Sequence, residues 1–279
     1  MVFRNYYICS PTWEDKLEFY STINLNDLFS SFLRKITTNS SIIIMKKTAG
    51  ELILNNLKPG KRLFLLCSDI GAAAASSIIS EPGTYSKFNE VIVVLTCEYV
   101  QGLQYFNNKL KQLAKEPLIQ SHAKNKLRFF RCVTQEPYPY SGDISWLIKS
   151  GLLIADLKTY NFNKMDRFII SGPRQPSLDV INLLGLIGYN EDSTSCLKDF
   201  IYERVFVNQI RKTIAVFNVL LEQLNESFPN KDQWLQLSFD LSVSSPFQPL
   251  SANQSRVGRD QKECVSLCLK LERDLSLID

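Results

Sequence analysis

The stretch that decides the fold is Arg62-Leu-Phe-Leu-Leu-Cys-Ser68, followed by Asp69-Ile-Gly-Ala-Ala-Ala-Ala-Ser-Ser-Ile-Ile79. The first part is a short apolar run entered by a turn at Lys58-Pro59-Gly60, which predicts a buried strand. The second part opens with small residues and predicts a helix that begins directly after the strand. Together they form the first step of an alternating pattern of strands and helices.

The same alternation continues along the chain. The predicted strands cover residues 91–95, 127–133 and 168–171, and helical patterns lie between them at about 101–116, 143–150 and 176–188. Strands that alternate with helices predict a doubly wound parallel sheet. We therefore interpret residues 59–207 as one α/β domain of the nucleotide-binding type.

The regions on either side of this domain differ from it in pattern. Residues 1–58 have strand-like segments around one helix and are short for an independent barrel. Residues 208–279 contain a helix with an apolar face, and a strand over 235–243 in which apolar and polar residues alternate. They end in a predicted helix with four apolar residues on one side: Cys264, Cys268, Leu271 and Leu275. We expect this C-terminal α/β extension to be folded and docked.

Composition excludes several classes of protein. The chain has 279 residues, is 45% hydrophobic and 22% charged, and is therefore globular in composition. A net charge of +4 is too small to indicate nucleic-acid binding, although contact with RNA stays open. No apolar run reaches the roughly 18 residues of a membrane span. Seven dispersed cysteines and a single histidine predict reduced thiols and no metal site.

Four short motifs of the chain are characteristic in their order and spacing. They are Phe3 to Trp13, Leu57 to Arg62, Gly142 with Ile144, and Phe200 to Val207. Together they resemble the bacterial-type ferredoxin–NADP(+) reductase family. The resemblance implies an NADP-binding-like α/β domain over 59–207, preceded by a flavin-domain β-barrel. Because the family's first half-barrel has no counterpart before Phe3, we expect residues 1–58 to be a truncated remnant of that barrel.

The resemblance also implies which residues touch FAD. In the family's Arg-x-Tyr-Ser motif, the arginine holds the FAD pyrophosphate and the tyrosine packs on the isoalloxazine; the matching residues are Arg4 and Tyr6. The serine that reaches the flavin ring is replaced by Tyr7, whose phenol is expected to crowd the ring. Gly50 keeps the position of a pyrophosphate-contacting loop, but Glu51 follows it with a charge of the wrong sign. Binding of FAD is therefore possible, with these four positions as candidates.

The groups that would bind NADP(H) are largely replaced. Of the family's phosphate loop, Ser68 and Gly71 remain, while Asp69 places a carboxylate near the phosphates and is expected to cap the following helix. Three arginines of the family correspond to Glu98, Gln135 and Asp143. Each lost contact is worth about 1.5–3 kcal/mol of binding free energy. Together, the three losses lower the affinity by more than about a thousandfold. We expect the chain not to bind NADP(H).

These departures lead to a functional hypothesis. Ser171 and Glu203 match active-site positions of the family but are expected to be vestigial. We expect a non-catalytic reductase-fold subunit without a cofactor, which binds other protein subunits through residues 208–279 and the exposed barrel edge. Because the resemblance is to proteobacterial reductases, we expect the complex to be a mitochondrial respiratory or ribosomal one. The cytoplasm is the other expected location. The alternative is a flavoprotein oxidoreductase that binds FAD with the help of another chain.

Overall fold

The computed structural model describes residues 5–21, 32–37, 40, 42, 44, 50–159, 161–191, 197–203 and 269–272. The chain divides into two compact units, Met1–Val207 with Glu263–Asp279, and Asn208–Lys262. The described residues all belong to the first unit. Arg4, the predicted strand over 235–243 and most of the C-terminal extension lie outside them.

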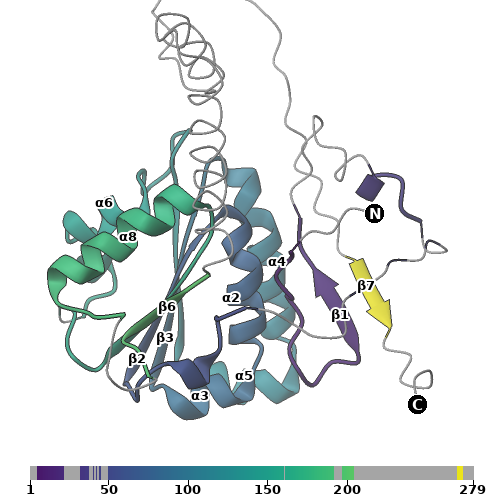
Figure 1. Ribbon diagram of the computed structural model, residues 1–279, viewed down its shortest axis with the longest axis horizontal. Coiled ribbons are helices and arrows are strands. Elements are labelled where there is room, and N and C mark those ends of the chain that lie inside the picture. Colours follow the sequence, from purple (N-terminus) through teal and green to yellow (C-terminus); the bar gives the residue numbers. More distant parts are fainter. Residues whose placement is uncertain are drawn as a thin grey trace, which may run out of the picture. The chain divides into compact units, whose positions relative to one another are not determined.

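A parallel sheet forms the centre of this unit (Figure 1). It has five strands, in the order β4-β3-β2-β5-β6. In the central register, Leu65 of β2 lies between Val93 of β3 and Ile169 of β5. The predicted strands are confirmed, and β2 and β3 at the centre are nearly continuous apolar runs because both faces of the sheet are covered there. The strands are β2 (Arg62–Ser68), β3 (Glu90–Cys97), β4 (Leu127–Val133), β5 (Asp166–Ser171) and β6 (Phe200–Tyr202).

Helices cover both faces of the sheet (Figure 1), which confirms the doubly wound arrangement. Alternate residues of β2 enter different cores: Leu63 and Leu65 pack in one, Phe64 and Leu66 in the other. The first core lies under α2 (Ala72–Ile79), α3 (Pro82–Lys87), α4 (Gln104–Leu113) and α5 (Pro117–Ala123). The second lies under α6 (Ile144–Lys149), α7 (Leu152–Asp156) and α8 (Arg174–Ile187). Among the described residues, no helix combines the length and apolarity needed to span a membrane.

Three short helices, α3, α5 and α7, are absent from the sequence-based prediction. Each begins at a local signal instead of a periodic pattern: α3 and α5 have proline in their first turn, and α7 follows Gly151 at φ 73°. The side chain of Glu116 caps α5 by accepting a hydrogen bond from the Leu118 N–H. Helices of five to seven residues present too few turns for hydrophobic periodicity to reveal them.

Two strands far apart in sequence form a separate antiparallel pair, in which β1 (Lys16–Phe19) lies beside β7 (Leu269–Glu272). The helix predicted near the C-terminus is therefore wrong at residues 269–272. Leu-Lys-Leu-Glu alternates apolar and charged residues, which suits a strand once an edge such as β1 is available as a partner. This pairing brings part of the C-terminal extension back onto the N-terminal segment.

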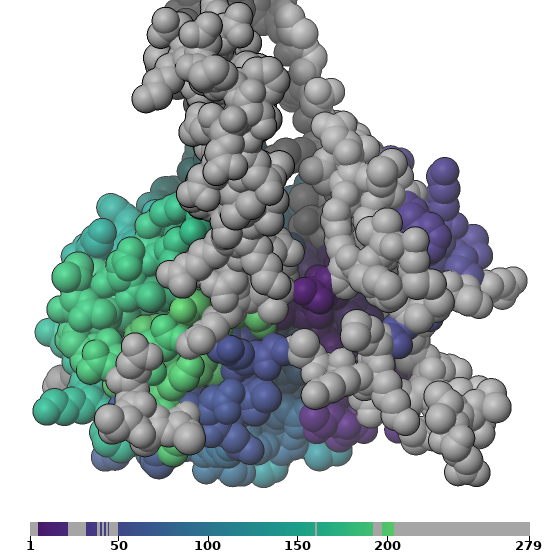
Figure 2. All heavy atoms as spheres, in the orientation of Figure 1, coloured from purple at the N-terminus to yellow at the C-terminus, as the bar shows by residue number. Residues whose placement is uncertain are grey.

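The N-terminal segment, residues 5–21, is anchored to the helices of the α/β domain. Glu18 of β1 and Lys109 of α4 form an ion pair of 3.0 Å with both side chains buried. The Trp13 indole N–H donates to the Ser80 carbonyl oxygen at the end of α2, at 2.9 Å. Figure 2 shows purple atoms of this segment beside blue and teal atoms of the domain. These contacts place the segment at the domain's edge.

Candidate functional site

The sheet topology indicates where a ligand would bind. Order reverses between β2 and β5, since the chain continues from β2 to β3 on one side and from β5 to β6 on the other. In doubly wound sheets, ligands bind outside the carboxyl ends of the strands at this switch point. The loop η2 (Asp69–Gly71) follows β2, and Gly172 follows β5, so both loops lie at this edge.

The two loops are packed backbone against backbone. A Cβ atom added to Gly71 would lie 2.1 Å from the Ser171 carbonyl oxygen, and one added to Gly172 would lie 2.7 Å from the Ser68 carbonyl oxygen. The Ser171 hydroxyl donates to the Gly71 carbonyl oxygen at 3.0 Å. Only glycine fits at these two positions, because any side chain would push the loops apart. The structure thus brings together three predicted site residues: Ser68, Gly71 and Ser171.

The loop that matches the family's phosphate loop has an unusual backbone at its start. Asp69 adopts φ 46°, a left-handed conformation that is unusual for a residue other than glycine. The prediction that Asp69 caps α2 is wrong: the N-cap residue is Gly71, and no side-chain cap is made there. Asp69 instead begins the 3-10 turn η2, which displaces it from the cap position. Ala72 to Ala75 are all buried, as expected for packing on the sheet.

Tyr7 reaches this edge from the N-terminal segment. Its half-buried ring packs against a small cluster that contains Ala73 of α2. Burial, then the neighbouring Glu203 carboxylate and Cys67 thiol, raise the pKa of the Tyr7 phenol, while the Gly172 backbone lowers it. Glu203 follows β6 and is only 9% exposed. The phenol therefore lies among groups at the ends of β2, β5 and β6.

Two other candidate FAD residues are described by the structure. Gly50 lies near the Glu203 carboxylate, and Tyr6 directly precedes Tyr7 in the sequence. Gly50 is exposed at φ 138°, and a Cβ added there would lie 3.3 Å from Glu203 Oε2. Tyr6 is half-buried, and its phenol oxygen accepts a hydrogen bond from the Ser21 hydroxyl at 3.5 Å. Sequence reasoning identified these residues but not the convergence of Tyr7 and Gly50 on Glu203.

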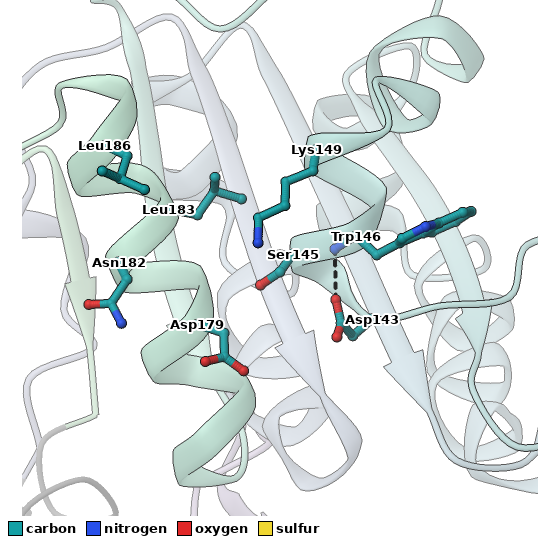
Figure 3. A pocket seen from close by; sticks show the side chains of 8 residues that line it. All are labelled: Asp143, Ser145, Trp146, Lys149, Asp179, Asn182, Leu183 and Leu186. Atoms are coloured by element: carbon teal, nitrogen blue, oxygen red, sulfur yellow. Dashed lines mark hydrogen bonds between the residues drawn. The ribbon is translucent and has the colours of Figure 1, made fainter.

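The three positions that match the family's arginines lie exposed on the carboxyl side of β3 and β4. The Gln135 N–H donates to the Glu98 carbonyl oxygen at 2.9 Å, which holds these two residues side by side. Asp143 caps α6 by accepting from the Trp146 N–H at 2.7 Å (Figure 3). None of the three is a cation, so these positions offer carboxylates and an amide where phosphate would need positive charge.

A shallow groove of about 390 Å³ lies between α6 and α8 (Figure 3). It is lined by Asp143, Ser145, Trp146, Lys149, Asp179, Asn182, Leu183 and Leu186. It is not lined by the loops after β2 and β5, so it is a different place from the switch-point edge of the sheet. The described residues hold no group of three or more potential metal ligands, and their four cysteines are free and buried.

Comparisons with known proteins agree with this geometry. No family model matches the chain. A flavodoxin/ferredoxin–NADP reductase of Rhodobacter capsulatus is 33% identical over 209 residues, which are 75% of this chain and 77% of that protein. A ferredoxin–NADP reductase A of Sorangium cellulosum is 32% identical over 213 residues, 76% of this chain and 77% of the relative.

A solved structure shows the same fold. The crystal structure of a ferredoxin NADP+ reductase from Neisseria gonorrhoeae, with bound FAD and NADP, aligns with a TM-score of 0.64 at 23% identity. The alignment covers 72% of this chain and 79% of that chain. The sequence relatives, which reach 33% identity over more than three quarters of their length, decide the assignment. The chain belongs to the ferredoxin–NADP reductase family.

Proposed function

We propose that the chain is an FAD-binding oxidoreductase of this family that discriminates against NADPH. The observation that carries the proposal is the contrast between Gly50, which is exposed, and Gly71, whose backbone packs against Ser171. The relatives are named as reductases, and one solved neighbour binds FAD and NADP. This support favours FAD over the cofactor-free state that we expected from the sequence.

The residues on the flavin side fit FAD. Gly50 is exposed and has no side chain to cover a pyrophosphate. The half-buried ring of Tyr6 offers an apolar surface for a flat ring system. When bound, FAD would supply the capacity to accept and release electrons, and the protein would bind and orient it.

The residues on the other side do not fit NADPH. Glycines in a phosphate loop let a pyrophosphate approach the backbone, whereas the Cα of Gly71 faces the Ser171 carbonyl oxygen, so the packing of the fold already requires this glycine. Asp69 lies at the start of the same loop, and its carboxylate would repel a phosphate. Glu98 and Asp143 add two further negative charges at the strand ends. We therefore propose that another electron donor serves this chain.

The test is the flavin content of the protein purified without denaturation. It is measured by the absorption of the flavin chromophore at about 350–500 nm. We expect bound FAD in the wild-type chain and its loss in Gly50→Ala. Gly151→Ala is the matched control, because Gly151 also has a positive φ but no neighbouring atoms within 4 Å. A wild-type chain that stays flavin-free after incubation with FAD would refute the proposal.

A second candidate function is the non-catalytic subunit expected from the sequence. The replaced cations at Glu98, Gln135 and Asp143 favour it, since a scaffold used only for its surface needs no nucleotide contacts. It would show as a flavin-free chain that copurifies with other subunits. The mitochondrial location and the respiratory or ribosomal partner stay predictions.

A further inference from the structure

We infer that the outer edge of the sheet, formed by α4, α5 and β4, is a docking surface for single-stranded RNA. This surface is separate from the candidate flavin site, and the inference does not rest on the proposed function. It starts from an uneven distribution of charge. Residues 104–133 carry seven lysines and arginines and one glutamate, a net charge of +6, whereas the whole chain carries +4. The other residues are together net negative, so the positive charge is concentrated in this segment.

Four of the seven cations are available to a partner. Three of the seven bond within the protein: Lys109, Lys126 and Arg128. The other four are exposed, and their side chains form no ion pair or hydrogen bond with any residue that the structure describes: Lys111, Lys115, Lys124 and Arg131. They come from both helices and from the edge strand β4. An exposed cluster of one sign attracts polyanions.

A groove beside α4 gives this charge a defined place. Two flanks of α4 are already covered, since Phe106 and Leu113 are buried in the core and Lys109 binds the N-terminal segment. The third flank carries residues at the three- and four-residue spacing of one helix face. Together with Arg131 of β4 they line a shallow groove of about 410 Å³, the edge groove: Asn107, Leu110, Lys111 and Ala114.

The groups around the edge groove match those by which proteins bind single-stranded RNA. The Arg131 guanidinium lies over the Phe129 ring, 4.6 Å from its centroid. Arginine planes and aromatic rings are the surfaces on which unpaired bases stack. Lys111 supplies a cation for the phosphates at the same groove. The Asn107 Oδ1 atom is buried and accepts no hydrogen bond within the described part of the chain, and the RNA 2′-hydroxyl is a donor that could reach such an acceptor.

Other polyanions fit these observations less well. An acidic protein would bring carboxylates, which only accept hydrogen bonds and would leave Asn107 Oδ1 without a donor. A membrane-surface helix inserts an exposed apolar face, whereas Phe106 and Leu113 of α4 are buried in the protein. Double-stranded RNA is recognised over about 16 base pairs, far more than a groove of about 410 Å³ can hold. A single strand is the form of polyanion that fits.

The experiment measures binding of a fluorescein-labelled oligouridine of about twelve nucleotides to the full chain, by fluorescence anisotropy at several salt concentrations. Lys111→Gln and Arg131→Gln should each lower the affinity about fivefold at about 0.1 M salt and reduce the slope against log salt by about 0.7. Arg131→Lys, which keeps the charge but loses the plane, should lower the affinity and leave the slope unchanged. Lys149→Gln is the matched control, because Lys149 is an exposed lysine of α6, and should change neither quantity.

Three further probes distinguish the partners: an oligodeoxyuridine of the same length, polyglutamate, and vesicles of phosphatidylcholine with phosphatidylserine. RNA should bind most tightly, and Asn107→Ala should remove its advantage over the deoxy strand, which lacks the 2′-hydroxyl. Equal binding of RNA and any other probe, or equal loss in Lys111→Gln and Lys149→Gln, would overturn the inference. Thermal unfolding checks that each variant is folded. The assay needs no flavin, so its outcome is independent of the test of the proposed function.

Discussion

The buried ion pair between Glu18 and Lys109 offers the sharpest test of how the N-terminal segment is attached. Its two side chains are 9% and 6% exposed, and 91 residues separate them in sequence. Glu18→Gln removes one charge with little change in shape. The ammonium of Lys109 then stays buried without its counter-charge, and that is the costly state.

The expected loss can be set against a matched pair at the surface. Removing one partner of a buried pair costs about 3–5 kcal/mol of unfolding free energy. The pair between Arg128 and Glu90 has a similar distance, 2.8 Å, but side chains that are 35% and 23% exposed. Glu90→Gln should therefore cost about 0–1 kcal/mol. The double variant Glu18→Leu with Lys109→Met should recover most of the loss, since no buried charge remains.

Urea unfolding provides the measurement, and Trp13 provides the probe. The Trp13 indole N–H is bonded to Ser80 of the domain, so its fluorescence reports release of the segment. Replacing Trp146 and Trp234 by Phe leaves Trp13 as the sole tryptophan. If Glu18→Gln costs no more than Glu90→Gln, the segment is not held by this pair and the reasoning fails.

Two further predictions concern the packed loops and the buried thiols. Gly71→Ala should destabilise the chain by about 1–3 kcal/mol or more, because its Cβ would lie 2.1 Å from a backbone atom. Gly185→Ala, in helix α8 with open space around it, should stabilise the chain by about 0.5–1 kcal/mol. Thermal unfolding in which both variants change stability alike would contradict this prediction. Burial raises the pKa of Cys9 and Cys67 to about 12 and that of Cys132 to about 11, from 9.0. Above pH 9 the unfolded chain then releases protons that the folded chain keeps, so stability should fall between pH 9 and about 12. A urea midpoint that does not change from pH 8 to pH 10.5, or that changes equally in the triple Cys→Ala variant, would contradict this.

The centre of the sheet could be predicted closely because β2 and β3 are buried on both faces. The run at 62–68 matches β2 in both bounds, and so does 127–133 for β4 at the sheet edge, although β4 is only partly buried. A run such as 62–68 needs no knowledge of its partners, since any parallel neighbour buries it equally well. The strand β7 is the opposite case. Its four residues become a strand through pairing with β1, a long-range contact that the local pattern does not contain.

The candidate site could be predicted in composition but not in geometry. The carboxyl ends of parallel strands meet at one edge, so the proximity of Ser68 and Ser171 follows from the topology. The place of the Tyr7 phenol does not. The sequence predicts that it would crowd a flavin ring, and the structure adds that Glu203 and the Gly172 backbone lie close enough to shift its pKa. The position of the end of a long side chain depends on the packing around it.

Gly71 shows that a glycine in a loop that resembles a binding motif can be required by ligand binding or by the packing of the fold. Both explanations must be compared before the glycine is taken as evidence of a binding site. In a phosphate loop, glycine lets a ligand approach the backbone. Here the end of β5 packs against the glycine instead, because the Ser171 carbonyl oxygen lies only 2.1 Å from the position that a Cβ would take. The glycine is therefore required by the fold whether or not a nucleotide binds. Gly50 differs, since its nearest neighbour is the far end of the Glu203 side chain, which can move. Loss of flavin in Gly50→Ala with normal stability would thus indicate a ligand contact, and loss of stability in Gly71→Ala would not.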